Sequence, residues 1–255
     1  MSTATAELDG KVAIVTGAGQ GVGRGIAAAL AAAGSSVVLV GRTPAKVEAV
    51  QREIAAQGGE ALAIGADVAV NEDIDRCVAA TLEAYGTVDI LVNNAITQPL
   101  GPLLAVSDAG FEAGYLSGPM ATFRFMRACH PYLIGGGSIV NVGSGVALRP
   151  STAGFGCYAA VKEAIRSLTR AAACEWGPAG IRANVIMPLS MSPAMEGFFA
   201  AMPEVAAEML GQIPLGRMGD SQLDIGRAVV FLCSDAASYI TGITLPVDGG
   251  QDYVR

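Results

Sequence analysis

Three residues in the middle of the chain have the types and spacing needed to move a proton. Tyr158 and Lys162 stand four positions apart, so on a helix they share one face about one turn apart. An isolated tyrosine titrates near pH 10, but a neighbouring ammonium favours the phenolate and lowers that pKa. Ser144 follows an apolar run and could donate a hydrogen bond to an oxygen that gains charge. Taken singly, each residue is equally compatible with a structural role: a half-buried aromatic, a solvated lysine and a turn serine.

A glycine-rich segment near the N-terminus could hold a phosphate. It lies between an apolar run that ends at Thr16 and an alanine-rich stretch, and it contains Gly17, Gly19, Gln20, Gly21, Val22 and Gly23. Glycines let backbone N–H groups approach a pyrophosphate, and a helix N-terminus adds its positive end. The spacing departs from a strict GxGxxG pattern, so a plain glycine-rich turn stays open. Its position after a first strand, where open α/β sheets bind ligands, favours the phosphate role.

The elements that must position these residues follow from a regular alternation along the chain. Short apolar runs predict strands at 11–16, 36–40, 61–66, 89–93, 138–142, 181–187 and 243–247. Helical stretches separate them at 22–33, 44–57, 71–85, 107–133, 158–176 and 221–234, and 188–220 is less regular. This alternation predicts βαβ units and a parallel sheet with helices on both faces. We expect one domain over 1–255, α/β and doubly wound with about seven strands, preceded by a flexible tail over 1–8.

Composition excludes several classes of protein. Hydrophobic residues make up 52% of the 255 residues and charged residues only 15%, the opposite of a disordered chain. With a net charge of −7 and three lysines, the chain lacks a basic surface for nucleic acid or an anionic membrane. We see no membrane span or signal peptide and expect a cytoplasmic protein. Five scattered cysteines and the single His130 predict no metal site.

Six short motifs, in chain order, together resemble the short-chain dehydrogenase/reductase family. They are TGAGQGVG at Thr16 to Gly23, Asp67-Val68, Asn93-Asn94-Ala95, Ser144 with Tyr158 and Lys162, Ile240-Thr241-Gly242, and Val247 to Gly250. The likeness covers about residues 8 to 251. It implies a Rossmann fold that binds a nicotinamide dinucleotide, with Ser144, Tyr158 and Lys162 as the catalytic residues.

The resemblance also implies which residues contact the cofactor. The glycine-rich segment would hold the pyrophosphate, and Asp67 and Val68 would contact the adenine ring. Lys162 would also hydrogen-bond the ribose of the nicotinamide half. The remaining cofactor-binding positions by resemblance are Asn93, Ala95, Tyr158, Pro188 and Leu189. Two alternatives stay open, because Asn93 could satisfy loop amides at a strand end and Asp67 could cap a turn.

The residues after the second strand favour NADP(H) over NAD(H). An acidic residue at the end of that strand would pair with the free ribose hydroxyls of NAD. This position is Gly41, followed by Arg42, which can hold a 2′-phosphate with two hydrogen bonds. Against this, Gln20 stands where NADP-binding relatives often carry a basic residue, and Arg42 could be an ordinary turn charge. We expect NADP(H), with NAD(H) as the alternative.

Three positions depart from the family pattern. Ile96 stands where the family usually has glycine, and Leu189 follows Pro188 where a second glycine is usual. Gly118 stands where the resemblance implies a fourth catalytic residue, an asparagine. Glycine keeps the main-chain carbonyl, and Pro119 supplies a helix distortion because it has no N–H to donate. We therefore expect a slower proton supply and a Gly118→Asn variant that changes the rate by less than about tenfold.

The resemblance implies an NADP(H)-dependent oxidoreductase that interconverts a ketone or 3-oxo compound and a secondary alcohol, with Tyr158 as general acid and base. The segment 188–220 would be a substrate lid, and its methionines suit an apolar small-molecule substrate. A homotetramer is expected. Two alternatives remain: a nucleotide-sensing binding protein with little or no turnover, and a dehydration or epimerisation on the same fold.

Overall fold

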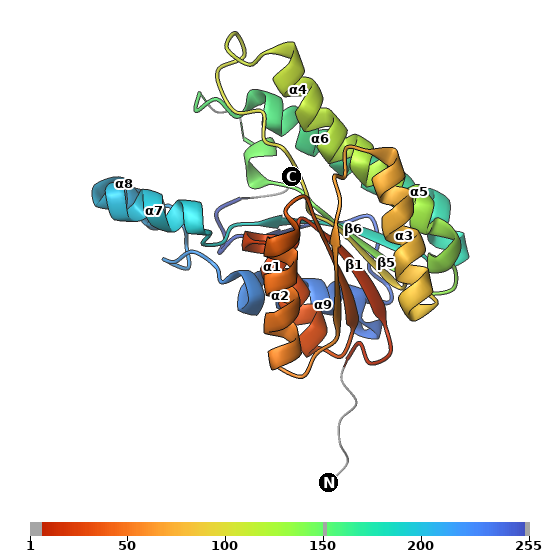
Figure 1. Ribbon diagram of the computed structural model, residues 1–255. Coiled ribbons are helices and arrows are strands. Elements are labelled where there is room, and N and C mark those ends of the chain that lie inside the picture. The colour runs from red at the N-terminus through yellow and green to blue at the C-terminus, as the bar shows by residue number, and fades with distance from the viewer. Residues whose placement is uncertain (1–6, 150–151, 253–255) are drawn as a thin grey trace.

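The computed structural model describes residues 7–149 and 152–252, and within them seven parallel strands form one sheet (Figure 1). The strand order is β3-β2-β1-β4-β5-β6-β7. The strands are β1 (Val12–Thr16), β2 (Ser36–Gly41), β3 (Ala61–Gly65), β4 (Ile90–Asn93), β5 (Ser138–Val142), β6 (Arg182–Pro188) and β7 (Thr244–Val247). The central strands are almost continuous runs of buried β-branched and aliphatic residues, as a sheet covered on both faces requires. The predicted doubly wound parallel sheet is confirmed.

Helices cover both faces of this sheet (Figure 1). One apolar core lies between the sheet and α1 (Gly21–Ala32), α2 (Pro44–Ala56) and α9 (Arg227–Cys233). The other lies under α3 (Asn71–Tyr85), α5 (Ala121–Leu133) and α6 (Gly156–Trp176). Helical spacing of apolar residues explains the packing: in α2, for example, Val47, Val50 and Ile54 all face the sheet and are buried.

The strand order creates a crevice between β1 and β4. After β1 the chain moves outward through β2 and β3, and then it returns past β1 to form β4 on the other side. The segments that follow β1 and β4 therefore diverge above neighbouring strand ends, which is where open α/β sheets bind ligands. The residues after β1, β2 and β4 all meet at this edge, although they come from distant parts of the sequence.

Two helical regions differ from the sequence prediction. The stretch 107–133 is not one helix but α4 (Asp108–Tyr115), a π-helical segment at Leu116–Met120 and α5. Pro119 lies inside the π-helical segment, and its missing N–H removes one bond from the regular ladder. The segment 188–220 is more regular than expected, because it contains α7 (Pro193–Ala201) and α8 (Pro203–Gly211), which protrude from the body in Figure 1.

The start of the fold lies earlier than predicted. Of the flexible tail expected over 1–8, residues 1–6 lie outside the described residues. Leu8 is buried, and its N–H donates to the carbonyl of Ala33 at 2.9 Å. Leu8 therefore belongs to the packed body because its side chain joins the core under α1.

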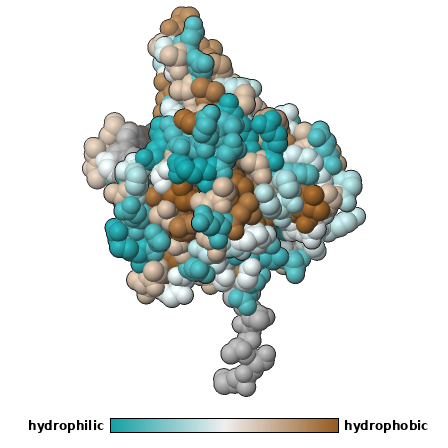
Figure 2. All heavy atoms as spheres, turned by 45° about the vertical axis from the view of Figure 1, so that its right-hand side comes forward, coloured by the Kyte–Doolittle hydropathy of each residue, from teal (hydrophilic) through white to brown (hydrophobic). Residues whose placement is uncertain are grey.

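The surface is mostly polar with separate apolar patches. Figure 2, which brings forward the side that carries α3 and α5, has apolar residues scattered among hydrophilic ones and gathered at the upper tip. Leu103 and Leu104, just before α4, are 71% and 103% exposed. None of the helices in the described residues combines the length and apolarity that crossing a membrane requires.

Candidate active site

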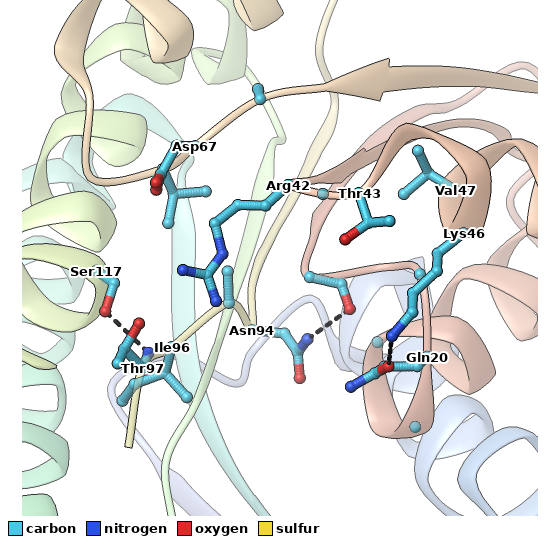
Figure 3. Close-up of a pocket in the computed structure, with 18 of the residues that line it drawn as sticks. Gln20, Arg42, Thr43, Lys46, Val47, Asp67, Asn94, Ile96, Thr97 and Ser117 are labelled. Carbon is cyan, nitrogen blue, oxygen red and sulfur yellow. Dashed lines mark hydrogen bonds between the residues drawn. The ribbon is translucent and has the colours of Figure 1, made fainter. Parts of the chain in front are cut away.

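A cleft of about 390 Å³ opens at the carboxyl ends of β1, β2 and β4 (Figure 3). Most of the residues predicted to bind a cofactor line it: Gly17, Gly19, Gln20, Gly21, Val22, Gly23, Arg42, Asp67, Val68 and Ala95. These residues come from the loops after β1, β2, β3 and β4 and from the first turn of α1. The topology thus brings together positions that the sequence separates by up to 78 residues.

Two positions of the first loop have no room for a side chain, which explains why they are glycines. Gly17 has a φ of 66°, and a Cβ there would lie 2.6 Å from Asn94 Nδ2. A Cβ on Gly23 would overlap the carbonyl oxygen of Gly17. The N-cap residue Gln20 makes no side-chain hydrogen bond to the first turn of α1, which leaves the first N–H groups of that helix for an anion. The loop fits a pyrophosphate by shape and by polarity.

Asn94, and not Asn93, connects the glycine-rich loop to β4. The backbone N–H of Asn94 donates to Thr16 Oγ1 at 2.9 Å, and its Nδ2 donates to the carbonyls of Thr16 at 3.0 Å and Gly17 at 3.2 Å. Asn93 is buried, and its Nδ2 donates to Asn141 Oδ1 at 2.8 Å. Successive strand residues point to opposite faces, so Asn93 lies in the sheet layer and does not line the cleft.

The structure brings the three predicted catalytic residues together. Tyr158 is 8% exposed, and its hydroxyl is hydrogen-bonded with the side chains of Ser144 and Gln98. Lys162, one turn further along α6, has its Nζ 5.6 Å from the centre of the Tyr158 ring and donates to the carbonyl of Val142 at 2.6 Å. Sequence reasoning missed Gln98, which lies in the loop after β4 and carries no motif of its own.

Burial controls the charge state of this group. It raises the pKa of Tyr158, although the hydrogen bonds from Ser144 and Gln98 act in the other direction. Burial also lowers the pKa of Lys162 to about 7. The lowering of the Tyr158 pKa that is expected from neighbouring positive charge stays a prediction for the cofactor-bound protein. In the protein alone desolvation is the largest cause and raises this pKa, and the Lys162 amine donates its hydrogen bond to the Val142 carbonyl.

The two residues predicted after β6 lie elsewhere. Pro188 ends β6, and the N–H of Leu189 donates to the carbonyl of Val247 at 3.0 Å. Leu189 lines a separate cavity of about 710 Å³ together with residues of the 214–224 and 246–252 segments. Neither residue lines the cleft, so their predicted cofactor contact stays a prediction.

Ile96 and Gly118 are sterically matched. A Cβ on Gly118 would lie 2.7 Å from Val161 Cγ1 and 3.3 Å from Ile96 Cδ1. Ile96 lines the cleft, and Val161 is fully buried on α6 next to Lys162. The expectation that Gly118→Asn changes the rate by less than about tenfold stays a prediction, and a side chain at this position must displace the Val161 side chain on the helix that carries Tyr158. The predicted helix distortion at Pro119 is present.

A second cation, Lys46, lines the same cleft as Arg42. Lys46 projects from the first turn of α2, and its Nζ donates to Gln20 Oε1 at 2.6 Å (Figure 3). A Cβ on Gly41 would lie 2.9 Å from Val47 Cγ1, so the position that carries an acid in NAD-binding sites has little room for a side chain. Lys46 carries no local sequence signal for this role, because its contact with Gln20 joins residues 26 positions apart.

Comparisons with known proteins agree with this geometry. A family model described as enoyl-(acyl carrier protein) reductase matches residues 17–252. A 12α-hydroxysteroid dehydrogenase from Clostridium sp. is 40% identical over 252 residues, which is 95% of this chain and 97% of that protein.

Two solved structures match the whole fold. One is a 7α-hydroxysteroid dehydrogenase complexed with NADH and 7-oxo glycochenodeoxycholic acid, with a TM-score of 0.90 and 34% identity over 99% of this chain and 98% of that one. The other is a short chain dehydrogenase from Burkholderia cenocepacia in complex with NADP, with a TM-score of 0.88 and 33% identity over 96% of this chain and 99% of that one. The chain belongs to the short-chain dehydrogenase/reductase family of oxidoreductases.

Proposed function

We propose that this protein is an NADP(H)-dependent oxidoreductase that interconverts a ketone or 3-oxo compound and a secondary alcohol. The observation that carries the proposal is the buried Tyr158 hydroxyl, hydrogen-bonded with Ser144 and one helical turn from Lys162. A proton donor held next to a second hydroxyl donor is what a carbonyl oxygen needs when it gains charge. The bound nicotinamide would supply or accept the hydride.

The protein's own residues divide the remaining work. In the direction of reduction, Tyr158 Oη donates its proton to the substrate oxygen while the Ser144 hydroxyl donates a hydrogen bond to the same oxygen. In the direction of oxidation, Tyr158 takes the proton back as a general base. Lys162 Nζ would hydrogen-bond the ribose of the nicotinamide half, and the positive charges of this amine and of an oxidised nicotinamide ring would oppose the effect of burial on the Tyr158 pKa.

Arg42 and Lys46 support the choice of NADP(H). Both side chains line the cleft after β2, where a 2′-phosphate on the adenosine ribose would lie. Thr43 and the N-terminus of α2 are at the same place, and Thr43 makes no side-chain cap to that helix. Two cations and the positive end of a helix favour a dianionic phosphate over two hydroxyl groups.

The surroundings of Ser144 and Tyr158 favour a substrate with an apolar body. A cavity of about 500 Å³ is lined by residues that follow Ser144 and flank Tyr158 along the chain: Val146, Ala147, Leu148, Arg149, Phe155, Gly156 and Ala159. Most of these side chains are apolar. The steroid alcohols and ketones named for two similar proteins have such a body.

The experiment is a cofactor and substrate panel. Consumption of NADPH and of NADH is followed with steroid ketones, sugar ketones and 3-oxo esters, and we expect turnover with NADPH on an apolar ketone. Arg42→Ala should reduce the preference for NADPH over NADH by about ten- to a hundredfold, since a charged hydrogen bond contributes about 1.5–3 kcal/mol. Arg52→Ala, at an exposed arginine on α2, is the control.

Two outcomes would redirect the assignment. Equal losses for NADPH and NADH in Arg42→Ala would leave Arg42 as a turn residue without a role in cofactor choice. Binding of NADPH without turnover of any carbonyl compound would favour the nucleotide-sensing alternative, which the glycine at position 118 motivates.

A further inference from the structure

The turn that begins at Ser144 is fixed at its start by the sheet. The N–H of Gly143 donates to the carbonyl of Ile186 in β6 at 2.7 Å. Beyond Ser144 the chain makes a single short turn, in which Ala147 N–H donates to the Ser144 carbonyl at 3.1 Å and Leu148 N–H donates to the Gly145 carbonyl at 3.0 Å. One turn of this kind holds few backbone hydrogen bonds, so its far end needs another support.

That support is a side chain from near the end of the chain. The Asp252 carboxylate lies directly on the Cα of Gly145, so close that a Cβ at position 145 would overlap its Oδ2. The same carboxylate forms an ion pair with Arg149 Nε at 2.6 Å. Asp252 thus contacts both ends of the turn 145–149, with only 4% of its side chain exposed.

Asp252 is itself held in place by the loop after β7. Its backbone N–H donates to Asp248 Oδ2 at 2.8 Å, and Asp248 Oδ1 accepts from the N–H of Gly250 at 3.0 Å. Asp248 follows β7, which pairs with β6. The carboxylate is therefore fixed to the same part of the sheet that anchors Gly143, and it reaches the serine turn from the other side.

We propose that Asp252 is a positioning residue for Ser144: by seating on Gly145 and pairing with Arg149, it holds the turn that keeps the serine hydroxyl against Tyr158. The inference rests on the proposed function, in which Ser144 binds the substrate oxygen. A displacement of Ser144 weakens its hydrogen bond to the substrate oxygen that gains charge. Cofactor binding should be unaffected, because other segments line the cofactor cleft.

Two independent substitutions remove the same contact. Asp252→Asn abolishes the charge of the ion pair, and Gly145→Ala displaces the carboxylate without changing it. Each should lower kcat by about three- to tenfold and leave the KM for NADPH unchanged. Because both act on one contact, their losses should not add in the double variant Gly145→Ala/Asp252→Asn. Asp9→Asn and Gly177→Ala are controls, since Asp9 is exposed and a Cβ on Gly177 meets nothing within 4 Å.

A second measurement does not depend on turnover. Hydrogen exchange of the Ala147 and Leu148 amides in the cofactor-free protein should be faster in Asp252→Asn than in the wild type, with core amides unaffected. If the wild type turns over no carbonyl compound, the proposed function fails, and this exchange difference still decides whether Asp252 holds the turn.

The inference is overturned by either of two results. One is unchanged protection of the two amides together with kcat values within about twofold of the wild type, a difference below 0.5 kcal/mol. The other is a fall in kcat accompanied by an equal rise in the KM for NADPH and a lower melting temperature, which would mark a general loss of structure.

Discussion

At the scale of single residues, Tyr158 illustrates how burial and hydrogen bonding oppose each other. Burial raises its pKa, whereas Ser144 and Gln98 lower it. A protonated hydroxyl is the form that a general acid needs in the direction of reduction. The structure thus provides a tyrosine that is protonated at neutral pH. For Tyr158 to act as a base, positive charge next to its hydroxyl must lower the pKa again.

Replacing this hydroxyl tests the proposed proton transfer. Tyr158→Phe should lower turnover by roughly two to four orders of magnitude, the usual contribution of a positioned acid or base. The affinity for NADPH, measured by fluorescence titration, should change little because the ring still packs against α6 neighbours. Tyr239→Phe, at a fully exposed tyrosine, is the matched control. A Tyr158→Phe enzyme that kept more than about a tenth of the rate would rule out the mechanism.

Lys162 makes the stability of the cofactor-free protein depend on pH. Its pKa is about 7 in the folded protein because of burial, below the ~10.4 of an unfolded chain. Below the folded pKa both states carry the proton, and the folded state bears the full penalty of a buried charge. As the pH rises above 7, the folded state loses the proton first, so the penalty is relieved and stability rises.

A lysine-to-methionine variant isolates this effect. The free energy of unfolding of the wild type should increase relative to Lys162→Met between about pH 6 and about pH 9, measured by chemical denaturation of the cofactor-free proteins. Lys11→Met, at a half-exposed lysine, should not follow this trend. A difference between wild type and Lys162→Met that is constant with pH would mean that Lys162 keeps its charge when buried. The same variant should also lose turnover and NADPH affinity, because the proposed function uses this amine at the ribose.

At the scale of elements, the π-helical segment Leu116–Met120 and α6 are fitted to each other. Because Gly118 has no side chain, the segment can approach Val161. Ser117 Oγ accepts a hydrogen bond from the Thr97 N–H at 2.9 Å, which joins the loop after β4 to the π-helical segment. The wider helix turn at Pro119 and the absence of a side chain at 118 therefore serve one packing arrangement. Ile96 fills the space on the cleft side.

This arrangement predicts a destabilised Gly118 variant. Gly118→Ala should lower the free energy of unfolding by about 1–3 kcal/mol through overpacking against Val161. Adding Val161→Ala should cost less in this background than in the wild type, because it removes the atom that the new Cβ meets. Urea denaturation of the four proteins in the cycle measures both effects. Strictly additive losses would mean that the two positions do not touch.

At the scale of the whole molecule, the exposed apolar residues favour self-association. Phe123 and Tyr132 on α5 and Ile134 after it are 39%, 42% and 57% exposed, and Leu104 is fully exposed. Figure 2 shows apolar patches among polar residues on the side of the molecule that it brings forward. Patches of this kind on a chain with only 15% charged residues are typical of surfaces that a further copy covers.

Light scattering at micromolar concentration tests the association. We expect a homotetramer with twofold symmetry, that is, four copies of the 25.8 kDa chain. Phe123→Asp should lower the mass of the particle if α5 lies in an interface. A wild-type particle with the mass of a single chain would refute self-association. A dimer would refute the tetramer and would mean that each copy uses only one interface.

The sheet, the glycine-rich loop and the pairing of Tyr158 with Lys162 could be predicted from the amino-acid sequence, because they depend on short-range patterns: apolar runs of strand length, glycines between a strand and a helix, and a four-residue spacing on one helix face. Ser144 joined this group through the family resemblance. The sequence did not distinguish Asn93, which bonds Asn141 inside the sheet, from Asn94, which bonds the glycine-rich loop, because only the alternation of side chains at the strand end separates them. The cofactor contact expected for Asn93 stays a prediction.

The contacts that join distant segments could not be predicted from the sequence and are known from the folded structure alone. Lys46 with Gln20, Ile96 with Gly118, and Asp252 with Gly145 and Arg149 are each brought together by the strand order or by helix packing. No local pattern marks these pairs, since each member is an ordinary residue in its own segment. The same is true of the Tyr158 and Lys162 pKa values, because burial is a property of the packed molecule and not of the spacing that first indicated the pair.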